Sequence, residues 1–129
     1  MTVKTEKKRI LVVDDLASDT RLVKLYLEGT NEYVVREEND AKAALSAAEE
    51  FQPQLILLDV AMPGIDGLKL ADHFRAHPTL NAAPIVFLTA IITKEEAEVG
   101  GWPIGKAPIL AKPVVLAELN ACIKRLLGG

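Results

Sequence analysis

Carboxylates that follow runs of large apolar residues are the side chains in this sequence best suited to chemistry. The run Leu55-Ile56-Leu57-Leu58 is followed by Asp59, and an earlier apolar run is followed by a pair of aspartates. In chain order, the candidate site residues at the ends of such runs are Asp14, Asp15, Asp59, Thr89 and Lys112. Because carboxylates in one cleft repel one another, this group requires a cation, and an all-oxygen site with room for water suits Mg²⁺.

Together these residue types are what the transfer of a phosphoryl group to a carboxylate requires. Asp59 can act as the nucleophile beside a metal ion, while the Lys112 ammonium and the Thr89 hydroxyl can meet the phosphoryl oxygens. The product would be an aspartyl phosphate. Each residue alone has an ordinary alternative, because aspartates often cap turns and Lys-Pro is a common loop dipeptide. Their joint occurrence after successive apolar runs favours the site.

The apolar runs must be strands for these residues to meet. Short apolar, β-branched runs predict buried strands at residues 9–13, 33–36, 55–59, 84–90 and 108–111, with segments of helical periodicity between them. This alternation predicts an α/β fold, a three-layer, doubly wound (βα)5 domain around a parallel five-stranded sheet. The carboxyl ends of parallel strands lie at one edge of the sheet, so the polar residues should converge there.

The first helix carries the most specific local expectations. Ser18 is expected to cap its start, and Gly29 to end it in the left-handed conformation. Leu22, Leu25 and Tyr26 follow helical spacing and should form its inner face.

Composition and charge exclude several classes of protein. With 129 residues, half of them apolar, the chain predicts one domain at residues 9–129 after an N-terminal tail at 1–8, with no linker to an output domain. A net charge of −3 argues against the broad basic surface that direct nucleic-acid binding needs. No apolar stretch approaches ~18 residues, so we expect no membrane insertion. The single cysteine, Cys122, allows no internal disulfide, which suits a cytoplasmic protein.

Over residues 9–127 the chain resembles the receiver domain of bacterial two-component response regulators. The resemblance is carried by Asp14-Asp15, by Asp59 with Met62-Pro63-Gly64-Ile65-Asp66-Gly67, by Leu88-Thr89-Ala90 and by Lys112-Pro113. It implies a flavodoxin-like fold with strand order 2-1-3-4-5, and Asp59 as phosphoacceptor. The other implied features are Mg²⁺ held by Asp14, Asp15, Asp59 and the Ala61 carbonyl, Lys112 as partner of the phosphoryl group, Thr89 as switch hydroxyl and a cis Lys112-Pro113 peptide.

The resemblance also implies a phosphorylation-dependent signalling switch of a two-component system or phosphorelay, rather than an enzyme. A sensor histidine kinase or a histidine phosphotransfer protein would donate the phosphoryl group to Asp59. The chain would catalyse only its own phosphoryl transfer and dephosphorylation. Its downstream partner would be another protein.

Three departures from the family pattern keep open a second interpretation, a pseudo-receiver that binds partners without phosphorylation. Ile109 stands where receivers usually have an aromatic residue that turns inward with the switch hydroxyl. A fourth helix is expected to begin near Thr93 and to end early, because residues 100–108 are rich in glycine and proline. Ala61 and Ile91 have no group that could orient an attacking water, which predicts slow hydrolysis of the aspartyl phosphate.

Two enzymatic alternatives fit the sequence less well. A phosphatase of the haloacid-dehalogenase kind also uses an aspartate at a strand end, but it carries a second aspartate two residues later, where this chain has Ala61. The segment from Gly100 to Lys106 is similar to the phosphate-binding loop of nucleoside triphosphatases. In that segment Ala107 replaces the Ser or Thr that holds Mg²⁺, so nucleotide binding is not expected.

Overall fold

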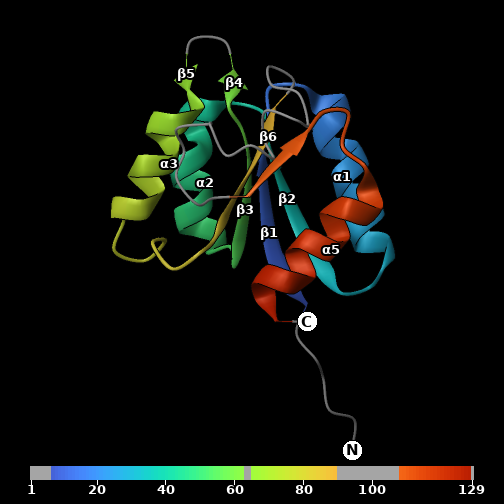
Figure 1. Ribbon diagram of the computed structural model, residues 1–129. Coiled ribbons are helices and arrows are strands. Elements are labelled where there is room, and N and C mark those ends of the chain that lie inside the picture. Colours follow the sequence, from blue (N-terminus) through green and yellow to red (C-terminus); the bar gives the residue numbers. More distant parts are fainter. Residues whose placement is uncertain (1–6, 63–64, 90–107, 129) are drawn as a thin grey trace, which may run out of the picture.

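The computed structural model describes residues 7–62, 65–89 and 108–128 (Figure 1). Its elements, in order, are β1 (Lys8–Val13), α1 (Ala17–Gly29), β2 (Tyr33–Glu38), the 3-10 turn η1 (Ala41–Ala43), α2 (Ala44–Phe51), β3 (Leu55–Asp59), β4 (Ala61–Met62), β5 (Ile65–Asp66), α3 (Gly67–Ala76), β6 (Ile85–Thr89), β7 (Ile109–Ala111) and α5 (Leu116–Leu127). The expected fourth helix near Thr93 lies outside the described residues.

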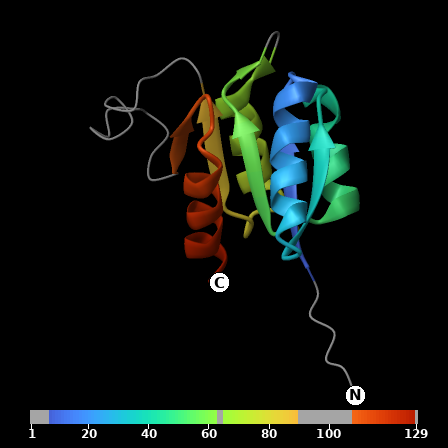
Figure 2. The ribbon, with the colours of Figure 1, turned by 90° about the vertical axis from the view of Figure 1, so that its right-hand side faces the viewer.

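The main sheet has five strands in the order β2-β1-β3-β6-β7, and every neighbouring pair is parallel (Figure 2). Counted along the chain, these strands have the order 2-1-3-4-5, so the predicted fold class and strand order are confirmed. A second, two-stranded antiparallel sheet of β4 and β5 was not predicted. It occupies the turn directly after Asp59, between the central strand and α3.

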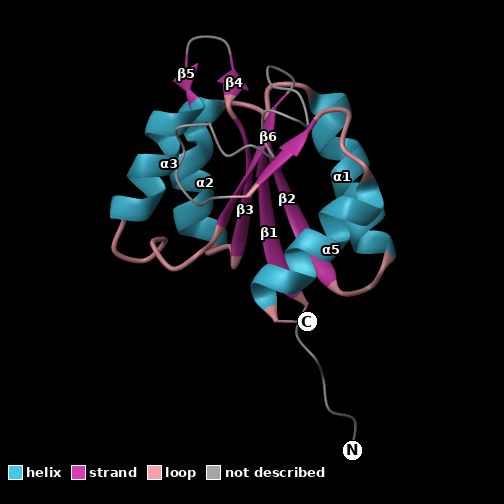
Figure 3. Ribbon diagram, viewed as in Figure 1, coloured by secondary structure: helices cyan, strands magenta, loops and turns pink. Residues whose placement is uncertain are grey.

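Helices cover both faces of the sheet, α2 and α3 on one side and α1 and α5 on the other (Figure 3). The strand sequences explain the two cores, because successive side chains of a strand point to opposite faces. In β3, Leu55 and Leu57 pack in the core that includes residues of α1 and α5, while Ile56 and Leu58 pack in the core with α2 and α3. A strand buried on both faces therefore reads as a continuous apolar run.

The predicted inner face of α1 is wrong for two of its three residues, whereas the third, Tyr26, is partly buried against the core. Leu22 and Leu25 are 53% and 64% exposed, whereas Val23 and Leu27 are buried against the sheet. The sequence contains two overlapping stripes with helical spacing, and periodicity alone cannot choose between them. The buried Thr20 lies on the same helix, and its hydroxyl donates a hydrogen bond to the Glu37 carboxylate of β2 across 2.8 Å.

The predicted caps of α1 are wrong, although the helix does end at Gly29. Ser18 does not cap the helix, which begins at Ala17 after Leu16 and has no side-chain cap. Gly29 is the last helical residue, and the left-handed residue after the helix is Asn31, with φ of 64°. An asparagine side chain tolerates this conformation, so the turn did not need the glycine. None of the helices that the structure describes is long and apolar enough to cross a bilayer.

Candidate functional site

Four strands of the main sheet end at the same edge, at the top of Figure 1. Val13 of β1 pairs in register with Leu58 of β3, and Thr89 of β6 pairs with Ala111 of β7. The candidate residues occupy these ends, with Asp14 after β1, Asp59 closing β3, Thr89 closing β6 and Lys112 after β7. The expected convergence at one sheet edge is therefore present.

Asp14, Asp15 and Asp59 each offer a carboxylate oxygen, and these oxygens lie within 4.8 Å of one another. Asp14 and Asp59 are 1% and 4% exposed, while Asp15 is exposed at the rim. The Asp14 Oδ1 accepts a hydrogen bond from the Leu16 amide, which turns the chain from β1 into α1. The Asn39 side-chain amide donates to the Asp14 carbonyl across 2.8 Å, so the site is tied to the loop after β2.

The Lys112 ammonium lies among these acids. Its Nζ is 2.5 Å from Asp14 Oδ2 and 3.2 Å from Asp59 Oδ2, and the side chain is only 12% exposed. Burial by itself lowers the pKa of Lys112, but the hydrogen bond and negative charge of Asp14, followed by those of Asp59, outweigh burial and raise this pKa above its usual value. The two carboxylates therefore favour the charged form of the lysine.

The backbone of β7 positions Lys112. Its amide donates to the Thr89 carbonyl across 2.9 Å, which joins the ends of β6 and β7. The Lys112-Pro113 peptide is cis, as the family resemblance implied. Thr89 itself is fully buried. Ile91 and the segment from Gly100 to Ala107 lie outside the described residues, so the expectations about them stay predictions.

The turn after Asp59 contains a close approach that requires glycine. Gly67 begins α3, and a Cβ at this position would lie 2.6 Å from the Asp59 carbonyl oxygen and 2.8 Å from the Val60 Cα. Both contacts are with backbone, so neither can move away easily. Asp66 caps the same helix, because its carboxylate accepts a hydrogen bond from the Leu68 amide across 2.9 Å. Ala61, two residues after Asp59, begins β4.

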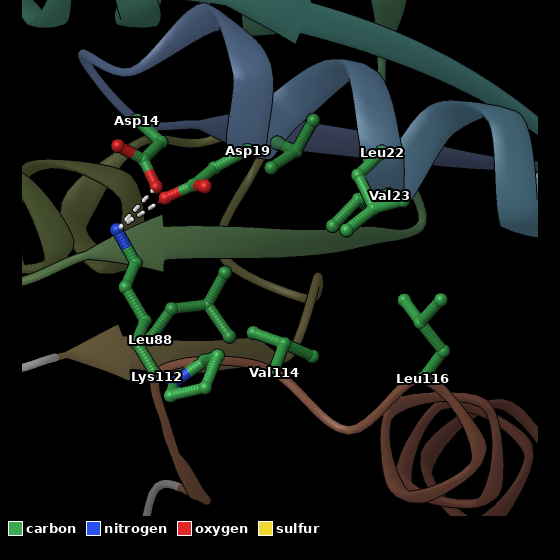
Figure 4. A pocket seen from close by; sticks show the side chains of 10 residues that line it. Asp14, Asp19, Leu22, Val23, Leu88, Lys112, Val114 and Leu116 are labelled. Carbon is green, nitrogen blue, oxygen red and sulfur yellow. Dashed lines mark hydrogen bonds and ion pairs between the residues drawn. The ribbon is translucent and has the colours of Figure 1, made fainter.

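Asp19 also contacts the lysine, and sequence reasoning missed it. Its Oδ2 is 3.3 Å from Lys112 Nζ, and its side chain is 42% exposed. Figure 4 shows Asp14 and Asp19 both directed at the ammonium. A signal was available, because Asp19 closely follows the Asp14-Asp15 pair and lies in the first turn of α1.

A small cavity of about 90 Å³ lies beside these ion pairs, between α1 and the segment that follows β7 (Figure 4). Asp14, Asp19 and Lys112 form its polar end. The rest of its lining is apolar and consists of Val12, Leu22, Val23, Leu88, Pro113, Val114 and Leu116. The ion pairs with Lys112 therefore close the polar end of an otherwise apolar space.

The three aspartates fit a divalent cation. Mg²⁺ takes oxygen ligands at about 2.0–2.1 Å in octahedral geometry, so two oxygens on opposite sides of the ion lie roughly 4.2 Å apart. Three carboxylate oxygens within 4.8 Å of one another are close enough to share one ion after adjustment of their side chains. The position of the Lys112 ammonium between Asp14 and Asp59 shows that the site accommodates positive charge.

Comparisons with known proteins agree with this geometry. A family model described as the response regulator receiver domain matches residues 10–124. The transcriptional regulatory protein ResD of Bacillus subtilis is 38% identical over 124 residues, which are 95% of this chain and 49% of that protein. The response regulator PleD of Caulobacter vibrioides is 35% identical over 118 residues, 92% of this chain and 26% of that protein. The chain thus spans about half of one relative and about a quarter of the other.

Solved structures with the same fold include the chemotaxis protein CheY4 of Vibrio cholerae, with a TM-score of 0.80, 26% identity, and coverage of 94% of this chain and 99% of that one. The BeF3-activated N-terminal receiver domain of RstA from Klebsiella pneumoniae has a TM-score of 0.76 and 27% identity, and the match covers 93% of this chain and 98% of that one.

Proposed function

This chain belongs to the response regulator receiver domain family, and on that premise we propose that it is a phosphorylation-dependent switch of a two-component system or phosphorelay. Asp59 accepts the phosphoryl group, and the donor is a histidine kinase or a histidine phosphotransfer protein. The observation that carries the proposal is that the Lys112 ammonium forms ion pairs with both Asp14 and Asp59, and that Asp15 lies beside these two acids. The proposed domain covers residues 9–129 after a tail at 1–8, although Lys8 already pairs with Tyr33 in β1.

In the proposed reaction, an Asp59 oxygen forms a bond to phosphorus while the bond between phosphorus and the donor imidazole nitrogen breaks. The imidazole leaves and takes up a proton. Mg²⁺, held by Asp14, Asp15, Asp59 and the Ala61 carbonyl, would supply positive charge to the phosphoryl oxygens. The Lys112 ammonium donates to one phosphoryl oxygen, and the Thr89 hydroxyl donates to another.

The switch itself would act at the edge formed by β6 and β7. Thr89 is buried at the end of β6, and its carbonyl accepts the Lys112 amide of the neighbouring chain segment. A phosphoryl group that engages both side chains therefore acts on two adjacent strands. Changing a two-state equilibrium from rare to dominant requires roughly 5.5 kcal/mol of differential stabilisation. The downstream partner is a protein, and neither direct nucleic-acid contact nor turnover of an external substrate belongs to the proposal.

A second candidate function is a pseudo-receiver that binds its partners without phosphorylation. The observation in its favour is Ile109, an aliphatic residue in β7 that packs against the core on the side of α2 and α3. An aliphatic side chain cannot respond to Thr89 by turning a ring inward, as an aromatic residue would. If this candidate is correct, the acids are retained for structure and Asp59 is never modified.

Intact mass measurement after incubation with Mg²⁺ and acetyl phosphate separates the two candidates. We expect a mass gain of one phosphoryl group for the natural chain and none for Asp59→Asn. Asp66→Asn is the matched control, because it removes an exposed carboxylate from the same turn and asparagine can still cap α3. No mass gain in the natural chain, or an equal gain in Asp59→Asn, would overturn the switch and favour the pseudo-receiver.

A further inference from the structure

Among the residues that the structure describes, Lys112 has three carboxylate partners, and they are not equivalent. An ammonium has three N–H donors, and the oxygens within reach belong to Asp14, Asp59 and Asp19, at 2.5, 3.2 and 3.3 Å. Asp14 and Asp59 are buried members of the group of acids that could hold a metal ion. Asp19 is outside that group and is partly exposed on the first turn of α1.

A divalent cation on Asp14 and Asp59 would remove two of the three partners of Lys112. The cation would compete with the ammonium for the carboxylates of Asp14 and Asp59, and the two positive charges repel each other. Lys112 is 12% exposed, so an ammonium without an acceptor there would be poorly solvated. Asp19 remains available because it does not belong to the metal-binding group, and within the part of the chain that the structure describes its only ion pair is with Lys112.

We propose that Asp19 is the positioning residue that holds the Lys112 ammonium at the rim of the site when Asp14 and Asp59 bind a divalent cation. Asp19 thereby lowers the free-energy cost of displacing the ammonium from Asp14 and Asp59, and it keeps the lysine close to an incoming phosphoryl group. Figure 4 shows the arrangement that carries this inference, with Asp19 and Asp14 approaching Lys112 from the α1 side. The role of the cation in this inference rests on the proposed function.

The inference predicts that Asp19 affects Mg²⁺ binding through Lys112. Asp19→Asn should weaken Mg²⁺ binding about 3- to 10-fold, within the range measured for coupled neighbours. Asp19→Glu, which keeps the charge on a longer side chain, should restore most of the affinity. In a Lys112→Met background the same Asp19→Asn change should have little effect, because no ammonium remains to be held.

The test is a double-mutant cycle on the full chain, with Kd for Mg²⁺ measured by isothermal titration calorimetry at constant ionic strength. The four proteins are the natural chain, Asp19→Asn, Lys112→Met and the double variant. Asp66→Asn is the control for loss of one negative charge near the site, and thermal unfolding without Mg²⁺ checks that each variant is folded. A long-range charge effect alone would make Asp19→Asn equally costly in both backgrounds, and that result would overturn the inference.

The two proposals can fail separately. If the natural chain binds Mg²⁺ and is phosphorylated on Asp59 but the cycle shows no coupling, only the role of Asp19 is overturned. If the cycle shows coupling but no phosphoryl group is gained, the role of Asp19 in Mg²⁺ binding is supported and the phosphorylation switch is overturned. If the natural chain does not bind Mg²⁺, both are overturned.

Discussion

The central strand β3 carries the Asp59 carboxylate, and the edge strand β7 leads into Lys112. The two strands are packed differently. All five residues of β3 are buried, and it has a neighbouring strand on each side. All three residues of β7 are only partly buried, and in the described sheet β6 is its one neighbour. The carboxylate proposed to form a covalent bond is thus on a strand that is buried along its whole length and paired on both sides. The ammonium proposed to change partners directly follows an edge strand and lies at the end of a long side chain.

The largest expected effect tests how strongly the two strands differ in packing. Ile56 of β3 is fully buried, and Ile109 of β7 packs against the same core but is only partly buried. We expect Ile56→Ala to lower the free energy of unfolding by about 2–5 kcal/mol, because it leaves a cavity that the neighbours cannot fill. Ile109→Ala should cost roughly half as much or less, because less apolar surface is lost. Urea unfolding of both variants measures the difference.

Equal losses for these two isoleucines would contradict the comparison. They would mean that the edge strand is as tightly held as the centre and that β7 has no particular freedom to respond to changes at Lys112.

A medium effect is expected where β3 meets α3. Gly67→Ala places a Cβ 2.6 Å from the Asp59 carbonyl oxygen, so the start of α3 must move away from the end of β3. We expect a loss of about 1–3 kcal/mol in the free energy of unfolding. Weaker Mg²⁺ binding should accompany it, because the turn that carries Asp59 shifts.

Gly29→Ala is the matched control for this change. Gly29 is the last residue of α1, and a Cβ there meets nothing within 4 Å. Alanine should therefore be neutral or stabilising by up to about 1 kcal/mol, because it favours the helix. If both substitutions have the same effect on stability, the contact with Asp59 is not what requires the glycine.

The smallest expected effect concerns the opposite edge strand, β2. A side chain of α1 forms a hydrogen bond with the backbone of this strand. The Glu28 carboxylate accepts from the Val35 amide at 2.9 Å and from Lys24 Nζ at 3.1 Å. Burial raises the pKa of Glu28, but the Val35 hydrogen bond, followed by Lys24, outweighs it and lowers this pKa below its usual value of 4.5. The stability that Glu28 contributes is then present above about pH 4.5 and is lost as the pH falls through the lowered pKa.

Glu28→Gln should accordingly lower the free energy of unfolding by less than about 1 kcal/mol at neutral pH, because the group is partly exposed. Below pH 4.5 the difference from the natural chain should shrink. Thermal unfolding between pH 3 and pH 7 measures this dependence. Glu32→Gln is the control, since the Glu32 carboxylate pairs with Lys124 across 3.4 Å and holds no backbone amide of β2. If the difference in the free energy of unfolding between the natural chain and Glu28→Gln grew toward low pH, the lowered pKa of Glu28 would be contradicted.

The local features that the sequence did not predict have a common physical cause. The inner face of α1 could not be chosen from spacing, because Leu22 and Leu25 satisfy the helical period as well as Val23 and Leu27 do. The small sheet of β4 and β5 has two residues in each strand, too few for a periodic signal. In both places local patterns were ambiguous, and contacts with the rest of the fold decided the outcome.

The sequence by itself determined the parallel sheet, its strand order through the family resemblance, and the edge at which Asp14, Asp59, Thr89 and Lys112 meet. These features follow from apolar runs that need burial on both faces and from the common direction of parallel strands. Only the tertiary structure decided that Lys112 lies between Asp14 and Asp59, that Asp19 is its third partner, and that Gly67 must lack a side chain. Distances between atoms far apart in the chain depend on the phase of each helix and the register of each strand, and no local pattern encodes them.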